Sequence, residues 1–97
     1  MYNPDELKTL YEFLQHTAQG NLKKMLCDQK FTDVHLNLLL KVAKSSTKEQ
    51  FIQCLEKDEF PKIKMSANES KIREGFWGLC LDVFKSRGLM SPVAKAA

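Results

Sequence analysis

The sequence predicts a single, compact, all-α domain of four to five helices. Apolar side chains recur at helical spacing through most of the chain, which is the primary signal for amphipathic helices. Several of these stretches follow a Ser, Thr or Asn that has a Glu three residues later, the pattern of a helix-starting capping box. With 97 residues the chain has the length of one domain, which we place at residues 1–89, followed by a flexible C-terminal tail at 90–97.

The first helix is expected to begin at Asn3, which suits an N-cap, with Pro4 at the first helical position and Glu6 as the reciprocal partner. Gly20 is expected to end it, because glycine favours the left-handed conformation at helix C-termini. A short helical segment is expected to follow over 21–28.

The next helix is predicted from Thr32 to about Lys44. Its polar side chains fall on one narrow stripe, and the remainder is mostly Leu, Val and Ala. A helix that is apolar around most of its circumference belongs at the centre of a fold. We therefore expect this helix to be the core element.

Two further capping boxes, Ser46 with Glu49 and Ser66 with Glu69, predict helices over 47–57 and over 66–87. Between them, 58–65 is expected to be an extended connector, pinned to the core by its apolar residues Phe60, Ile63 and Met65. The last helix should end at Gly88 in a left-handed turn, with Leu89 returning to contact Phe84.

Composition excludes several classes of protein. The three cysteines, Cys27, Cys54 and Cys80, are odd in number and widely spaced, so they predict neither a disulfide framework nor a metal site. We expect reduced thiols and a cytoplasmic protein. No apolar run approaches the roughly 20 residues needed to cross a bilayer, and the N-terminus lacks a secretion signal. Neither a metal nor a cofactor is predicted.

The sequence predicts no enzyme, because its nucleophiles and bases show no catalytic spacing. Gly75 and Gly78 match no phosphate-binding loop. We expect buried structural cysteines, an exposed His16 and a partly buried, neutral His35, since a cationic ring is disfavoured at a helix N-terminus.

The last predicted helix carries the candidate partner-binding residues. Interior glycines cost stability, about 1 kcal/mol each relative to alanine, and are tolerated where another backbone approaches closely. Packing against another helix of the same chain is the interpretation we favour for them, with a partner protein as the alternative. For Trp77 and Leu81 we favour the core over a contact patch. The candidate set is Lys71, Gly75, Trp77, Gly78, Leu81 and Asp82.

The alternative is weak nucleic-acid binding around a helix-turn-helix-like junction between the helices ending near Lys44 and beginning at Thr47. The net charge of +3 is small for a nucleic-acid binder, and the second helix offers no arginine for reading bases. The basic residues that would serve this role are Lys41, Lys44, Lys48, Lys62, Lys64 and Arg73.

The function predicted from the sequence is therefore a small non-enzymatic protein-binding module: a regulator, an inhibitor, an immunity-type protein or an adaptor. Its expected partner is another protein; nucleic acid is the weaker alternative, and a homo-oligomer is a third arrangement that the sequence leaves open.

Overall fold

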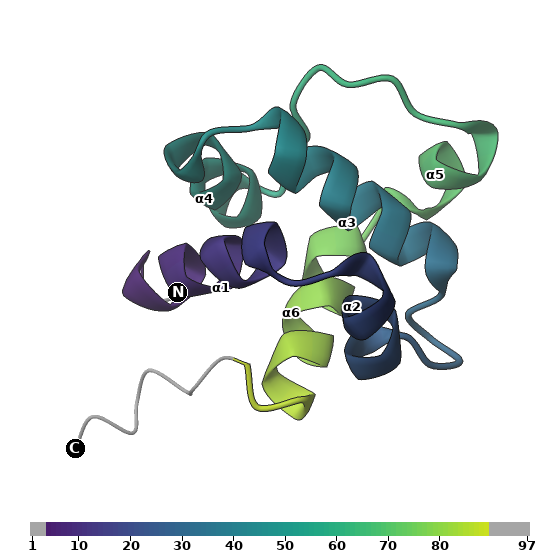
Figure 1. Ribbon diagram of the computed structural model, residues 1–97. Helices are drawn as coiled ribbons and strands as arrows, with labels where there is room; N and C mark the ends of the chain where they lie inside the picture. Colours follow the sequence, from purple (N-terminus) through teal and green to yellow (C-terminus); the bar gives the residue numbers. More distant parts are fainter. Residues whose placement is uncertain (1–3, 90–97) are drawn as a thin grey trace.

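The described part of the chain folds into six helices (Figure 1). The computed structural model describes residues 4–89, and no strand occurs among them. The predicted all-α bundle is confirmed, with one helix more than expected. The helices are α1 (Pro4–His16), α2 (Gln19–Leu26), α3 (Asp33–Ser45), α4 (Lys48–Lys57), α5 (Ala67–Ile72) and α6 (Phe76–Ser86).

Helix α3 lies at the centre of the bundle, as predicted. It contacts α1, α2, α4 and α5, and Figure 1 shows it crossing the middle of the molecule. Its apolar side chains are buried along nearly the whole helix. A helix buried on several sides must be apolar on several sides, which is the pattern that the sequence shows. The buried residues of α3 are Leu36, Leu38, Leu39, Leu40, Val42 and Ala43.

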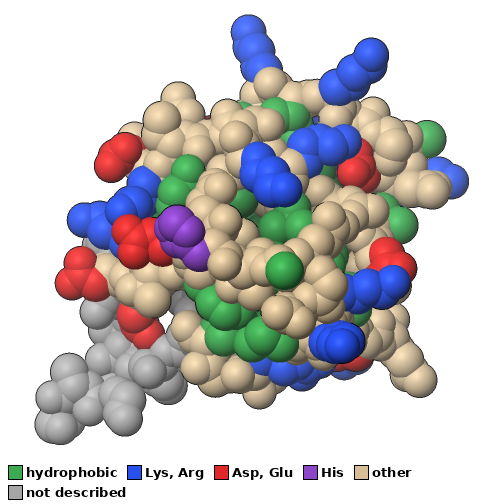
Figure 2. All heavy atoms as spheres, in the orientation of Figure 1, with side chains coloured by type: hydrophobic (Ala, Val, Ile, Leu, Met, Phe, Trp, Pro, Cys, Tyr) green, Lys and Arg blue, Asp and Glu red, His purple; other side chains and the backbone are tan. Residues whose placement is uncertain are grey.

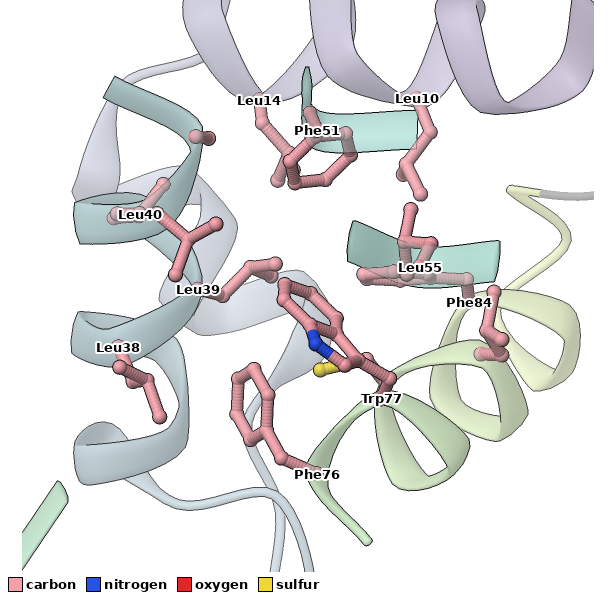
Figure 3. Packing of buried hydrophobic residues seen from close by; sticks show 14 of the residues in the cluster. Leu10, Leu14, Leu38, Leu39, Leu40, Phe51, Leu55, Phe76, Trp77 and Phe84 are labelled. Carbon is pink, nitrogen blue, oxygen red and sulfur yellow. The ribbon is translucent and has the colours of Figure 1, made fainter. Parts of the chain in front are cut away.

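An aromatic cluster fills the space between α3, α4 and α6. The Trp77 indole from α6 lies among Leu39, Leu55 and Phe76 (Figure 3). Its ring centroid is 5.0 Å from that of Phe76 and 6.0 Å from that of Phe51, both with tilted or edge-on geometry. Such arrangements suit the quadrupoles of aromatic rings and add to the benefit of burying them.

The connector between α4 and α5 is extended, as predicted. Its residues Phe60, Ile63 and Met65 are half-buried and pack against the core. The Phe60 ring stacks on Trp77, with centroids 5.3 Å apart. The connector is thus held down by side chains and needs no regular secondary structure of its own.

The N-cap residues agree with the predictions for two helices, α3 and α5, and differ for α4. Thr32 caps α3 and Ser66 caps α5, as expected. Helix α4 begins at Lys48, and its N-cap is Thr47, one residue later than the expected cap Ser46. The Thr47 hydroxyl accepts from the Gln50 N–H, and the Gln50 side chain accepts from the Thr47 N–H. The predicted cap Asn3 lies outside the described residues.

Ser46 is the C-cap of α3 rather than the N-cap of α4. It is buried, and its carbonyl accepts a 2.8 Å hydrogen bond from the hydroxyl of Tyr11. The predicted stop at Gly20 is also wrong. Helix α1 ends at His16, the backbone is extended at Ala18, and Gly20 lies inside α2.

The predicted helix over 66–87 is broken into α5 and α6. The break lies at Gly75, whose φ of +70° is left-handed and incompatible with a continuous helix. The other end was predicted correctly. Gly88 is left-handed at φ +74°, and the Leu89 N–H donates to the Phe84 carbonyl at 2.8 Å, as in a Schellman motif. The predicted tail at 90–97 lies outside the described residues.

Candidate functional site

Two of the six residues predicted to bind a partner are in the core. Trp77 is 1% exposed and Leu81 is 3% exposed. The Trp77 Nε1–H donates to the carbonyl of Glu59 at 2.8 Å, so its polar atom is also satisfied inside the protein. The core interpretation is confirmed for both residues, and neither is available for surface contact. The others, Lys71, Gly75, Gly78 and Asp82, are exposed.

No other described element of the chain lies close to Gly75 or Gly78. A Cβ added at Gly75 or at Gly78 would meet no heavy atom of a neighbouring element within 4 Å. The interpretation that they pack against another helix of this chain is therefore wrong. Gly75 is needed for its positive φ, whereas Gly78 sits in α6 with an open surface above it.

The two positions should respond to alanine in opposite directions. Gly78→Ala should stabilise the protein by about 0.5–1 kcal/mol, because alanine loses less backbone entropy in a helix. Gly75→Ala should destabilise it by about 1–2 kcal/mol, because a Cβ is disfavoured in the left-handed region. Urea denaturation followed by circular dichroism measures both. A loss of stability in Gly78→Ala would contradict the open surface seen there.

A groove lies between α6 and the loop that joins α2 to α3. It encloses about 510 Å³, within the range of small-ligand and peptide pockets. Half-buried Leu79 and buried Val83 form its apolar part. Polar side chains surround them. The lining residues are Asp28, Gln29, Lys30, Leu79, Asp82, Val83 and Ser86; we call this the α6 groove.

The loop side of the groove is a tight turn built around Asp28. One oxygen of its carboxylate accepts the backbone N–H groups of Lys30 and Phe31, at 2.8 and 2.9 Å. The other forms a 2.8 Å ion pair with Arg87 at the end of α6. The backbone N–H of Phe31, followed by those of Lys30 and by Arg87, lowers the pKa of this carboxyl. Near neutral pH the Asp28 carboxylate is therefore charged, and both of its oxygens hold the turn in place.

Arg87 also connects the groove to an exposed apolar residue. Its Nε–H donates to the carbonyl of Met25 at 2.8 Å, which places the end of α2 beside the end of α6. Met25 is 39% exposed, and no other large hydrophobic residue among residues 4–89 is as exposed. An exposed apolar side chain therefore lies at the end of α2 that Arg87 contacts.

The groove carries one acidic and one basic side chain that are not neutralised. Asp82 on α6 and Lys30 on the loop are both exposed, and neither forms an ion pair with another described residue. Asp82 belongs to the predicted partner-binding set. The groove thus offers an apolar floor between opposite charges.

A second hollow, of about 690 Å³, lies between the connector and the α5–α6 junction. It contains the predicted residues Lys71 and Gly75, but its lining mixes acids and bases. The Arg73 guanidinium lies 5.6 Å from the centroid of the Phe60 ring, a cation–π contact. The full lining is Asp58, Glu59, Phe60, Ser70, Lys71, Arg73, Glu74 and Gly75.

The basic residues predicted for nucleic-acid binding are partly neutralised. Lys41 is paired with Glu69, and Lys48 is paired with Glu12. Lys44, Lys62 and Lys64 are exposed without such a pair in the described part of the chain. Figure 2 shows Lys and Arg side chains spread over the face in view, with acidic side chains beside several of them.

The cysteines are not activated. Burial raises the pKa of Cys54 and raises that of Cys80 well above its ordinary value. Burial also raises the pKa of Cys27, with a further contribution from Asp33. A nucleophilic cysteine needs the opposite shift. These thiols are therefore arranged as core and near-core side chains.

The described residues contain neither a cluster of metal ligands nor a membrane-spanning helix. No three or more His, Cys, Asp or Glu side chains gather in a way that could hold a metal ion. No helix in this part of the chain is long and apolar enough to cross a membrane.

No known protein family, curated protein or solved structure matches the chain.

Sequence reasoning missed the α6 groove apart from Asp82. Leu79 and Val83 have the spacing of a core face, and only the structure shows that Leu79 is left half-buried. The loop carries one local signal, an Asp three residues before a buried Phe, which is typical of an Asx-type turn. That signal predicts a turn, but it does not predict that the turn lies opposite α6.

Proposed function

We propose that this chain is a non-enzymatic protein-binding module that holds a short segment of its partner in the α6 groove. The observation that carries this proposal is the apolar floor of Leu79 and Val83 set between Lys30 and Asp82. A segment with one or two apolar side chains flanked by polar or charged ones fits such a lining. Apolar contact would supply affinity, and the charges would fix orientation.

Two neighbouring features support the same surface. Gly78 is one helical turn before Asp82 and leaves the backbone of α6 open to close approach. Met25, whose carbonyl accepts from Arg87, carries an exposed apolar side chain at the end of α2. The loop side is held by the Asp28 turn and its ion pair, so little ordering would be needed on binding. A pre-organised surface loses less entropy when it binds.

Selection of peptides displayed on phage tests the proposal. Peptides chosen by the wild-type protein should contain apolar residues and should lose at least about tenfold in affinity, roughly 1.4 kcal/mol, for Leu79→Asp. The control is Glu56→Lys, which changes an exposed side chain on α4, a helix that does not line the groove, and it should bind normally. Circular dichroism confirms that both variants fold.

Failure to select any peptide, or equal binding by Leu79→Asp and the wild type, would overturn the proposal. Weak nucleic-acid binding through the exposed Lys44, Lys62 and Lys64 stays a prediction. The roles of regulator, inhibitor, immunity-type protein and adaptor all require a bound partner, and the peptides selected would separate them.

A further inference from the structure

The His35 side chain contacts two aromatic rings that belong to different parts of the fold. Its ring centroid is 5.5 Å from that of Phe31, at an interplanar angle of 30°. It is also 6.1 Å from that of Phe76, and the two planes are nearly parallel at 6°. Phe31 is fully buried and Phe76 is 1% exposed. His35 therefore joins the α2–α3 loop to the start of α6.

The same ring completes the N-terminal cap of α3. Its Nδ1 accepts the backbone N–H of Thr32 at 3.1 Å and lies 2.9 Å from the Thr32 hydroxyl. A nitrogen that accepts from an N–H carries no proton, so this geometry requires the neutral ring. The residue three positions after the N-cap, which is His35 in α3, is Gln50 in α4 and Glu69 in α5. Among these three capping boxes of the described residues, the one of α3 alone uses an imidazole, the side chain whose ordinary pKa is nearest to neutral pH.

Phe31 connects this cap to the groove. It follows directly after the groove residues Asp28, Gln29 and Lys30. Its N–H donates to the Asp28 carboxylate, and its carbonyl accepts from the Asp28 N–H at 2.9 Å. Displacing Phe31 would therefore break the hydrogen bonds that close the turn. The position of the groove's loop side depends on how firmly Phe31 is held.

We propose that His35 is a proton-sensitive switch for loop 27–32. The neutral ring holds Phe31 and the Thr32 N–H, and the loop stays closed against α6. Protonation removes the acceptor, places two N–H donors against each other, and puts a cation at the positive end of the α3 dipole. The loop then opens more often. An effect on partner binding rests on the proposed function of the groove; the opening itself is a property of the free protein.

The surroundings of the ring favour its neutral form. Burial lowers the pKa of His35 from its ordinary value of 6.5, and no charged group contributes to that shift. Because the folded protein holds the proton less tightly than the unfolded chain, stability from this site is complete above 6.5 and is lost as the pH falls below it. The charged residues on the α2–α3 loop, the first turn of α3 and the turn before α6 are Asp28, Lys30, Asp33, Arg73 and Glu74. Further along α3 and α6 are Lys41, Lys44, Asp82 and Lys85.

Amide hydrogen exchange measured by NMR tests the switch in the free protein. Protection of the Asp28 and Phe31 amides is compared about one pH unit above and about one below 6.5, after correction for intrinsic exchange. Wild type should lose protection several-fold at the lower pH. His35→Gln should not, because glutamine keeps the acceptor without titrating, as Gln50 does in α4. His16→Gln, which removes an exposed histidine, should respond as wild type does.

Two results would overturn the proposal: equal protection at both pH values in wild type, or the same pH response in His35→Gln. The pKa of His35 can also be measured by NMR titration of the wild-type protein. A pKa at or above 6.5 would overturn the proposed switch. Peptide binding, measured beside the hydrogen exchange, distinguishes the His35 switch from the proposed binding function of the α6 groove. A pH-dependent loop in a protein that binds no peptide supports the switch and rejects the groove, whereas peptide binding with a pH-independent loop does the reverse.

Discussion

Replacing Trp77 by alanine should lower the free energy of unfolding by about 3–5 kcal/mol, the range for truncating a buried aromatic residue. The indole is 1% exposed and contacts the rings of Phe51, Phe60 and Phe76. Its removal leaves a cavity at the meeting point of three helices and the connector. That cost is a large part of the roughly 5–15 kcal/mol that stabilises a typical domain. Urea denaturation followed by far-ultraviolet circular dichroism measures it.

Two variants control for the source of the effect. Trp77→Phe keeps an aromatic ring but removes the Nε1–H that donates to the Glu59 carbonyl, and should cost less than Trp77→Ala. Met25→Ala truncates a large side chain that is 39% exposed, and should change stability by no more than about 0.5 kcal/mol. A Trp77→Ala variant as stable as Met25→Ala would show that the indole is not in the core.

The sequence was a good guide where one physical requirement dominated. Helix α3 is apolar around most of its circumference, and only a central position satisfies that pattern. The Gly88–Leu89 ending was predictable for a similar reason, since a left-handed residue after a helix strongly favours glycine. In both cases the information is contained within one element.

The failures lie where neighbouring residues offer equivalent local signals. Ser46 with Glu49 and Thr47 with Gln50 are both good capping pairs, one residue apart. The choice is made by Tyr11, whose hydroxyl donates to the Ser46 carbonyl across 35 residues of sequence. Gly75 is a similar case. A glycine is tolerated within a helix and also permits a break, and only packing around it decides.

The candidate site was hidden for the same reason. Arg87 joins the end of α6 to the loop side of the groove by binding Asp28, a contact that spans 59 residues of sequence, and it also binds the Met25 carbonyl. No periodic pattern encodes such a contact. The predicted set on α6 contained the right helix, but it mixed exposed residues such as Gly78 and Asp82 with core residues such as Trp77 and Leu81.

Removing the Lys41 ammonium should have the second largest effect, because it leaves a carboxylate inside the protein. The Lys41 Nζ lies 2.6 Å from an oxygen of Glu69 and 3.0 Å from the Lys64 carbonyl. The Glu69 side chain is 7% exposed. In Lys41→Met that carboxylate keeps the Ser66 N–H as a partner but loses its counter-ion. Breaking a fully buried pair costs about 3–5 kcal/mol; we expect about 2 kcal/mol here because Lys41 is 37% exposed.

The matched control is Lys48→Met. It removes an ion pair of the same kind, but the partner Glu12 is 56% exposed and keeps its hydration, so the denaturation midpoint should not change measurably. Glu69→Gln in the Lys41→Met background should recover part of the loss, because the amide still accepts from Ser66 and carries no buried charge. No recovery would show that Lys41 acts through its contact with Lys64 rather than through Glu69.

The pH dependence supplies an independent check on the same pair. Lys41, and then the backbone N–H of Ser66, lower the pKa of Glu69 below its ordinary value of 4.5. The unfolded chain then binds the proton more tightly than the folded protein. Stability from the charged carboxylate is therefore complete above 4.5 and is lost as the pH falls through the folded-state pKa. Wild type should lose more stability on acidification below 4.5 than Lys41→Met does, since the variant lacks the partner that makes the charged form favourable. Equal losses in the two proteins would mean that the ion pair contributes nothing to holding α5 and the connector against α3.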